Sequence, residues 1–245
     1  MVTAGVLRVM AGMLALCLAW PAPAAQAQPM APVAPAARIV HGTLTPDFPA
    51  VGALLVGDLV AGVGDGRQAI TGCTATLIGC NTAITAAHCV CGSDYTTGGC
   101  SGPNPPEARL YGVFFPHAGF YNATSVAVDP NYDIKASIGD IAIVHLAGPV
   151  TGIRPAALTD RAAAVGETGT IVGFGRTADD AQDFGVKRVG NVTLEDCNDG
   201  TNGAVICWTY DGTKSNVCTG DSGGPVFISG SAGAMIAGIT SSGTG

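Results

Sequence analysis

The pattern of apolar and polar residues predicts short β-strands rather than long helices. Residues 74–78 and 82–85 form two β-rich runs, joined by the short turn Gly79-Cys80-Asn81. Another run, with alternating apolar residues, begins at Asp140 directly after a glycine. The chain of 245 residues contains 36 glycines and 15 prolines, while 47% of it is hydrophobic and only 12% is charged. This composition predicts an ordered all-β protein with many turns.

The first 27 residues have the order of parts that is typical of a secretory signal peptide. One basic residue, Arg8, precedes an apolar run over residues 9–20, and small residues and prolines then lead to Ala27. A membrane span needs ~20 apolar residues, so this run of twelve is too short for one. Leu16 stands where a lipid-anchor motif at Cys17 would need a small residue. We therefore expect a secreted protein, extracellular or periplasmic, without a membrane anchor.

Residues 28–38 form a linker rich in proline and alanine that cannot bury a core. We interpret it as a propeptide that ends at Arg38. Of the 11 basic residues, Arg8 and Arg38 precede Ile39, whereas none of the 18 acidic residues does, so the net charge changes from −7 to −9 without this region. An acidic protein with scattered charges is a poor partner for nucleic acid.

The stretch "CTGDSGGPV" places Ser222 in a glycine-rich turn. Such a serine is either part of a tight turn or a nucleophile, and a nucleophile needs a base and amide donors elsewhere in the chain. His88 follows the second of the two β-rich runs, and Asp140 opens the alternating strand. Asp133 competes with Asp140 for the role of orienting acid but lacks the strand context.

Histidine, aspartate and serine in this chain order, each with its own local signature, resemble the trypsin/chymotrypsin family of secreted serine proteases. The resembling motifs are "TAAHC" around His88, "GDIAIV" around Asp140, "GFG" at residues 173–175, "GDSGGP" around Ser222 and "RIVHG" at Arg38. The likeness runs from residue 39 to residue 245. His117 and His145 match no family role, and we interpret them as structural.

The resemblance implies two packed antiparallel β-barrels with the active site in the cleft between them. The first barrel would run over residues 39–155 and the second over residues 156–245 of a protease domain that covers residues 39–245. In the family, a cysteine that pairs with the equivalent of Cys218, a last strand and a helix follow the segment that ends here at Gly245. We therefore expect the second barrel to be incomplete and to lack its C-terminal strand and helix.

The same resemblance assigns catalytic roles. Ser222 would be the nucleophile, His88 the general base and acid, and Asp140 the buried acceptor that orients the imidazole. The backbone N–H groups of Gly220 and Ser222 would form the oxyanion hole, where glycine keeps a side chain out of the site. The implied function is a secreted endopeptidase that cleaves protein or peptide substrates through an acyl-enzyme, without a cofactor. The alternatives are a catalytically silent binding protein with the same fold and an inactive fragment.

Activation and specificity also follow from the likeness. Cleavage after Arg38 by an activating protease would free the α-ammonium of Ile39, which would pair with Asp221 because a buried ammonium needs a carboxylate. The family's run Ile-Val-Gly-Gly has His41 at its third place here. The floor of the substrate pocket would be Asn216, which predicts a preference for an uncharged side chain. The pocket walls would be Val217, Ser241, Ser242 and Gly243.

Nine cysteines are present, and Cys17 would leave with the signal peptide. The resemblance pairs Cys73 with Cys89 and Cys197 with Cys207. A zinc site is the competing interpretation, but the Cys89-Val90-Cys91 spacing lacks a second pair of ligands, so we expect no metal. The three cysteines without a family counterpart are Cys80, Cys91 and Cys100, and a Cys91–Cys100 pair would leave Cys80 unpaired.

Overall fold

The structure of the chain, a computed structural model, describes residues 39–56, 70–91, 111–133, 138–178, 180–197 and 205–242. Within these residues the protein is built from β-strands and one 3-10 turn, η1 (Ala87–Cys89), so the expected all-β class is confirmed. The signal peptide, the propeptide with Arg38, Cys100 and Gly243 lie outside the described residues. The described part of the chain contains no helix with the length and apolar character that crossing a membrane requires.

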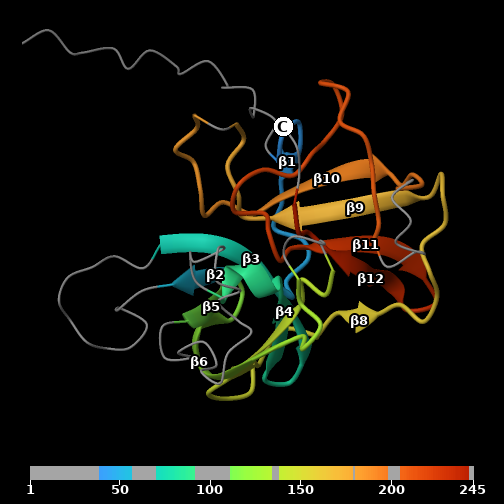
Figure 1. The fold of residues 1–245 in the computed structure, drawn as a ribbon. Helices are drawn as coiled ribbons and strands as arrows, with labels where there is room; N and C mark the ends of the chain where they lie inside the picture. The colour runs from blue at the N-terminus through green and yellow to red at the C-terminus, as the bar shows by residue number, and fades with distance from the viewer. Residues whose placement is uncertain are drawn as a thin grey trace, which may run out of the picture. The chain divides into compact units, whose positions relative to one another are not determined.

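The first half of the domain is a closed barrel of six antiparallel strands (Figure 1). Its strands are β2 (Val51–Val56), β3 (Ile70–Gly79), β4 (Thr82–Thr85), β5 (Tyr111–Phe115), β6 (Gly119–Val128) and β7 (Ala142–Leu146). The order around the barrel is β2-β3-β4-β7-β6-β5. Alternate residues of β7 are buried, as its alternating sequence predicts. The inward-facing side chains, among them Leu54, Leu77 and Val144, form the barrel core.

The second half is a six-stranded sheet (Figure 1). Its strands are β1 (Thr43–Leu44), β8 (Ala157–Leu158), β9 (Thr168–Gly173), β10 (Arg188–Thr193), β11 (Pro225–Gly230) and β12 (Gly233–Ile239). The order is β1-β10-β9-β11-β12-β8. The expected two-part all-β architecture is confirmed with one difference: β8 pairs parallel with β12, so the described sheet is mixed and open rather than a purely antiparallel barrel. Strand β1 precedes the first barrel in the chain but pairs with β10 of this sheet.

A shared apolar cluster joins the barrel to the second sheet. Val51 and Ile84 of the barrel pack in one buried cluster with Phe174, Phe227 and Ile236 of the second half. A backbone hydrogen bond crosses the same junction, because Thr74 N–H of β3 donates to the carbonyl of Ser222 at 2.8 Å. The turn that carries Ser222 is therefore held against the barrel that carries His88.

Candidate active site

The register of two barrel strands brings His88 and Asp140 together. Strands β4 and β7 are antiparallel, and Thr85 at the end of β4 lies opposite Ala142 at the start of β7. His88 follows Thr85 in the turn η1, and Asp140 precedes Ala142, so both lie at the same end of the strand pair. His88 Nδ1 is 2.7 Å from Asp140 Oδ2, and the backbone N–H of His88 donates to Asp140 Oδ1 at 2.9 Å.

Asp140 accepts a third hydrogen bond, which comes from the second half of the domain. The Ser241 hydroxyl donates to Asp140 Oδ2 at 2.5 Å. Burial acts to raise the pKa of Asp140, but the hydrogen bonds from His88 and Ser241 outweigh it and lower the pKa below its ordinary value. Asp140 is therefore ionised at neutral pH and accepts the Nδ1 proton of His88, which leaves Nε2 unprotonated in the neutral ring.

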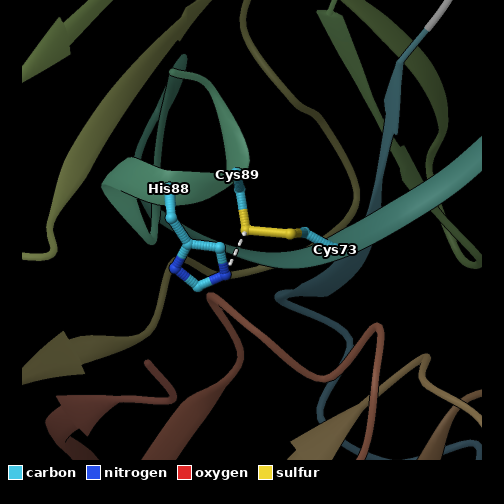
Figure 2. Close-up of side chains that lie close together, drawn as sticks. All are labelled: Cys73, His88 and Cys89. Carbon is cyan, nitrogen blue, oxygen red and sulfur yellow. Dashed lines mark hydrogen bonds between the residues drawn. A yellow bond between two sulfur atoms is a disulfide. The ribbon is translucent and has the colours of Figure 1, made fainter. Parts of the chain in front are cut away.

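A disulfide anchors the turn that carries His88 (Figure 2). Cys73 of β3 and Cys89 are joined, and the Cys89 sulfur lies 3.7 Å from His88 Nε2. These three side chains lie close enough together to resemble a metal site. Both sulfurs are consumed by the disulfide and cannot act as thiolate ligands, so the cluster is not a zinc site. A loop closure of this length stabilises the fold by about 3 kcal/mol.

Ser222 lies in a turn that packs on the strands next to His88. A Cβ on Gly223 would clash with Thr85 Oγ1 and would fall 2.9 Å from the backbone nitrogen of Ala86. Only glycine allows this close approach, and its φ of 78° also favours glycine. Ser222 itself is half-buried. No hydrogen bond joins Ser222 Oγ to His88 Nε2 in the described part of the chain, and such bonds commonly tighten only when substrate binds.

The turn around Ser222 presents two backbone N–H donors. The carbonyl of Thr219 accepts from Arg176 N–H at 3.0 Å, so the N–H of Gly220, on the opposite side of that trans peptide, points away from Arg176. Neither Gly220 N–H nor Ser222 N–H donates to any group among the described residues. Gly220 has a φ of 97°, and a Cβ there would lie 2.8 Å from the Phe184 ring. The two amides are therefore available to a ligand, and Gly220 cannot carry a side chain.

Asp221, between these donors, has a buried carboxylate. Its Oδ1 accepts from Gly175 N–H at 2.8 Å and its Oδ2 from Cys218 N–H at 2.9 Å. Burial raises the pKa of Asp221 to about 6, although the two N–H donors and the charge of Arg188 act to lower it. Ile39, whose ammonium was expected to pair with Asp221, is buried in the core of the second sheet in this uncut chain.

The predicted pocket residues occupy different settings. Asn216 is buried, its N–H donates to the carbonyl of Val40, and its Oδ1 accepts from Trp208 Nε1 at 2.9 Å. Val217 belongs to the core cluster of the second sheet, and Ser242 is exposed. Ser241, which was expected as a pocket wall, donates a hydrogen bond to Asp140, and Gly243 lies outside the described residues.

The structure separates the competing residues from the site. Asp133 is exposed and pairs through its backbone with Ile138, whereas Asp140 contacts His88. His117 is exposed and its Nε2 lies 2.8 Å from the carbonyl of Pro46. His145 lies within β7 opposite Thr82.

The two cysteine pairs that the resemblance implied are both present. Cys197 and Cys207 form a disulfide with a Cα–Cα distance of 5.2 Å. Cys91 is also disulfide-bonded, whereas Cys80 is exposed and unpaired among the described residues. The expected partner of Cys91, Cys100, lies outside those residues.

Sequence reasoning missed two residues of the site, Thr74 and Trp208, and the contact that Ser241 makes with Asp140. Thr74 is fully buried, and its hydroxyl donates to the carbonyl of Gly220 at 2.9 Å while accepting from Phe174 N–H at 3.1 Å. Trp208 holds the amide of Asn216, and Ser241 holds Asp140. A single polar residue in a strand or loop carries no sequence signal for such a role, so only the tertiary contacts reveal it.

A closed six-stranded barrel, packed on a second sheet and carrying an imidazole–carboxylate pair beside a serine turn, defines a chymotrypsin-like fold. The family model described as Trypsin matches residues 60–245, so the chain belongs to the trypsin family. The chain is 30% identical to a trypsin from Saccharopolyspora erythraea over 194 residues, which cover 74% of this chain and 78% of that protein.

A salmon relative and a human relative match shorter parts of the chain. Trypsin-1 of Salmo salar is 31% identical over 121 residues, 45% of this chain and 50% of the salmon protein. Kallikrein-11 of Homo sapiens is 30% identical over 169 residues, 63% of this chain and 57% of the human protein. The chain thus spans about half the length of the salmon trypsins that it matches.

Proposed function

We propose that this protein is a secreted serine endopeptidase that hydrolyses peptide bonds through an acyl-enzyme. The observation that carries the proposal is the His88–Asp140 pair at 2.7 Å, beside a turn that holds Ser222 and two N–H donors with no acceptor among the described residues. A serine alcohol becomes an effective nucleophile when such a base and such donors converge on it. Membership of the trypsin family supports the same function.

In the first half of the reaction, Ser222 Oγ attacks the carbonyl carbon of the substrate and His88 Nε2 takes the hydroxyl proton. Asp140 holds Nδ1–H, which selects the tautomer with Nε2 free, and stabilises the imidazolium that forms. The oxygen of the tetrahedral intermediate receives hydrogen bonds from Gly220 N–H and Ser222 N–H. Loss of one such donor typically costs about 10² to 10³ in rate.

In the second half, the intermediate collapses and His88 Nε2 gives its proton to the leaving amine. The acyl group stays on Ser222 Oγ as an ester. Water then attacks this ester, with His88 again taking a proton and returning it to Ser222 when the acid product leaves. Residues of the chain itself transfer each proton and receive each developing charge in this scheme.

We further propose that the protein is made as a zymogen. Burial raises the pKa of Asp221, so in the uncut chain its hydrogen bonds and nearby charge do not fully offset the desolvation of the ionised carboxylate. Cleavage after Arg38 would give Ile39 an α-ammonium, the charge that a buried carboxylate requires. Ile39 already lies in the core of the second sheet, in the same cluster as Val217 and Val226, which lie on either side of the turn that carries Ser222.

The substrate side chain on the acyl side of the cut bond would be uncharged. An indole N–H only donates, so Asn216 presents its oxygen to Trp208 and keeps its Nδ2 hydrogens for another partner. A floor of this kind offers a hydrogen-bond donor in place of the negative charge that would attract arginine or lysine. For the same reason we propose that another protease cleaves after Arg38.

The experiment that tests the function is covalent labelling of the secreted protein after cleavage at Arg38. A phosphonylating reagent should label Ser222 alone, and Ser222→Ala should abolish both labelling and peptide hydrolysis. Activity should fall as the pH drops, because a protonated His88 cannot accept the serine proton. Labelling that survives Ser222→Ala would contradict the assignment, and a folded, cut protein that is never labelled would favour the silent binding protein.

A further inference from the structure

A fully buried arginine lies behind the turn that carries Ser222. Arg188 opens strand β10, and its side chain is 0% exposed. Its Nη2 forms an ion pair with Asp183 Oδ2 at 3.3 Å and donates to the carbonyl of Asp183 at 3.0 Å. Asp183 in turn accepts from the N–H and the hydroxyl of Thr177. Burying a guanidinium costs several kcal/mol of desolvation, so a structural or functional role of Arg188 has to offset this cost.

One peptide group links Arg188 to Asp221. Arg188 Nη1 donates to the carbonyl of Gly175 at 2.6 Å, and Gly175 N–H donates to Asp221 Oδ1 at 2.8 Å. The residue between the two charged groups must be glycine, because a Cβ there would lie 2.7 Å from Asp221 Cγ and from the carbonyl of Thr219. The positive charge of Arg188 is also close enough to act on the Asp221 carboxylate.

The segment that contains Asp183 and Arg188 also packs directly on the amide donors. The Phe184 ring fills the space beside Gly220, where a Cβ would come within 2.8 Å of it. The Arg176 guanidinium lies over the same ring at 4.7 Å from its centre, and Arg176 N–H donates to the carbonyl of Thr219. Arg188 therefore closes a continuous network, from Asp183 through Gly175 to the turn around Ser222.

We propose that Arg188 is a positioning residue that holds the Gly220 and Ser222 amide donors in place before the chain is cut at Arg38. This proposal rests on the proposed protease function. In the uncut chain, Arg188 supports Asp221 and the turn around Ser222, a role that the Ile39 ammonium takes over in the cut chain. The uncut chain then retains an ordered turn around Ser222 and a measurable basal activity. Once the ammonium forms, it supports Asp221 directly, so dependence on Arg188 falls.

The test uses an uncut chain that is locked by Arg38→Gln, with and without Arg188→Met. Methionine keeps most of the apolar stem of arginine and removes its charge and its five donors. Amide hydrogen exchange of residues 173–176 and 218–222 gives a readout that does not need activity. We expect exchange in both segments to be faster by about tenfold or more in Arg188→Met.

The kinetic arm compares the locked chain with the cut form. Losing the placement of an oxyanion donor should lower kcat of the locked chain by about 10²-fold, with less than about a tenfold loss in the cut form and little change in KM. Arg188→Lys, which keeps the charge, should recover part of the locked chain's kcat. Equal losses in both forms, or equal behaviour of the lysine and methionine variants, would overturn the proposal.

Arg161→Met serves as the matched control. Arg161 also lies in the second half of the domain and pairs with Glu167, but its side chain is 44% exposed. It should change neither exchange around Ser222 nor kcat. If wild type is never labelled at Ser222, the protease function fails while the exchange result still decides the role of Arg188. Unchanged exchange in Arg188→Met overturns the proposal whatever the activity.

Discussion

Replacing Asp221 with asparagine should change the pH dependence of stability in the uncut chain. Burial raises the pKa of Asp221 to about 6, from an ordinary value of 3.8. Because the folded state binds this proton more tightly than the unfolded state, the stabilisation is fully present below about pH 3.8 and is lost as the pH rises through about 6. A shift of this size corresponds to about 3 kcal/mol, and asparagine has no proton to lose.

The substitution also has a cost that does not depend on pH. Gly175 N–H and Cys218 N–H each donate to one carboxylate oxygen of Asp221, and asparagine offers only one oxygen. An unsatisfied buried donor costs about 1 to 3 kcal/mol. We therefore expect Asp221→Asn to be destabilising at about pH 3.5 and close to neutral or stabilising at about pH 7.5.

Denaturant unfolding at both pH values measures the difference, on chains that carry Arg38→Gln and Ser222→Ala so that no cleavage occurs. Glu167→Gln is the control of opposite sign, because the Arg161 hydrogen bond lowers the pKa of Glu167 to about 2. The stabilisation that the ionised Glu167 carboxylate contributes is present at neutral pH and is lost in acid. If the free energies of unfolding of the Asp221→Asn chain and its parent differ by a constant amount over the pH range, the reasoning is refuted.

Further substitutions test other contacts of the site and one backbone conformation. Asp140→Asn should lower kcat by about 10³ to 10⁴, whereas Ser241→Ala, which removes one hydroxyl donor to Asp140, should cost about tenfold or less; similar losses in steady-state assays would contradict this ranking. Asn216→Asp should raise kcat/KM for arginine substrates relative to matched uncharged ones by about tenfold or more, and an unchanged ratio would remove Asn216 from the pocket floor. His41→Gly should stabilise the chain by about 0.5 to 1 kcal/mol, because His41 has a φ of 58°. His41→Ala keeps the Cβ and should give no such gain in the same unfolding assay.

The sequence contains the information for local features of the site. The strand–turn–strand pattern before His88 appears as β3 and β4, and the alternating run after Asp140 appears as β7. These elements follow from periodicity and turn chemistry, which act over a few residues. The glycines around Ser222 also indicate a tight turn from the sequence alone, because positive φ and close backbone approach exclude side chains there.

Pairing between distant segments needed the tertiary structure. Nothing in the residues themselves predicts that β8 joins the second sheet parallel to β12. Nor do they predict that β1, which precedes the first barrel in the chain, pairs with β10 of the second sheet. Two-residue strands carry no period, so their partners are decided by the space that the larger strands leave. The expected antiparallel pairing of the second half came from resemblance, which describes a family rather than the strand pairing of one chain.

The sequence by itself determined which chemical groups are present and which short motifs carry them: an imidazole after a strand, a carboxylate before one, and a serine in a glycine turn. Only the tertiary structure decided which groups meet. Ser241 reaches Asp140 across 101 residues, Thr74 reaches Gly220 across 146, and Arg188 is buried beside Gly175 at the start of a strand. The physical reason is that a hydrogen bond requires heavy atoms within about 3 Å, and that distance is decided by strand register and packing between the two halves of the fold rather than by local sequence.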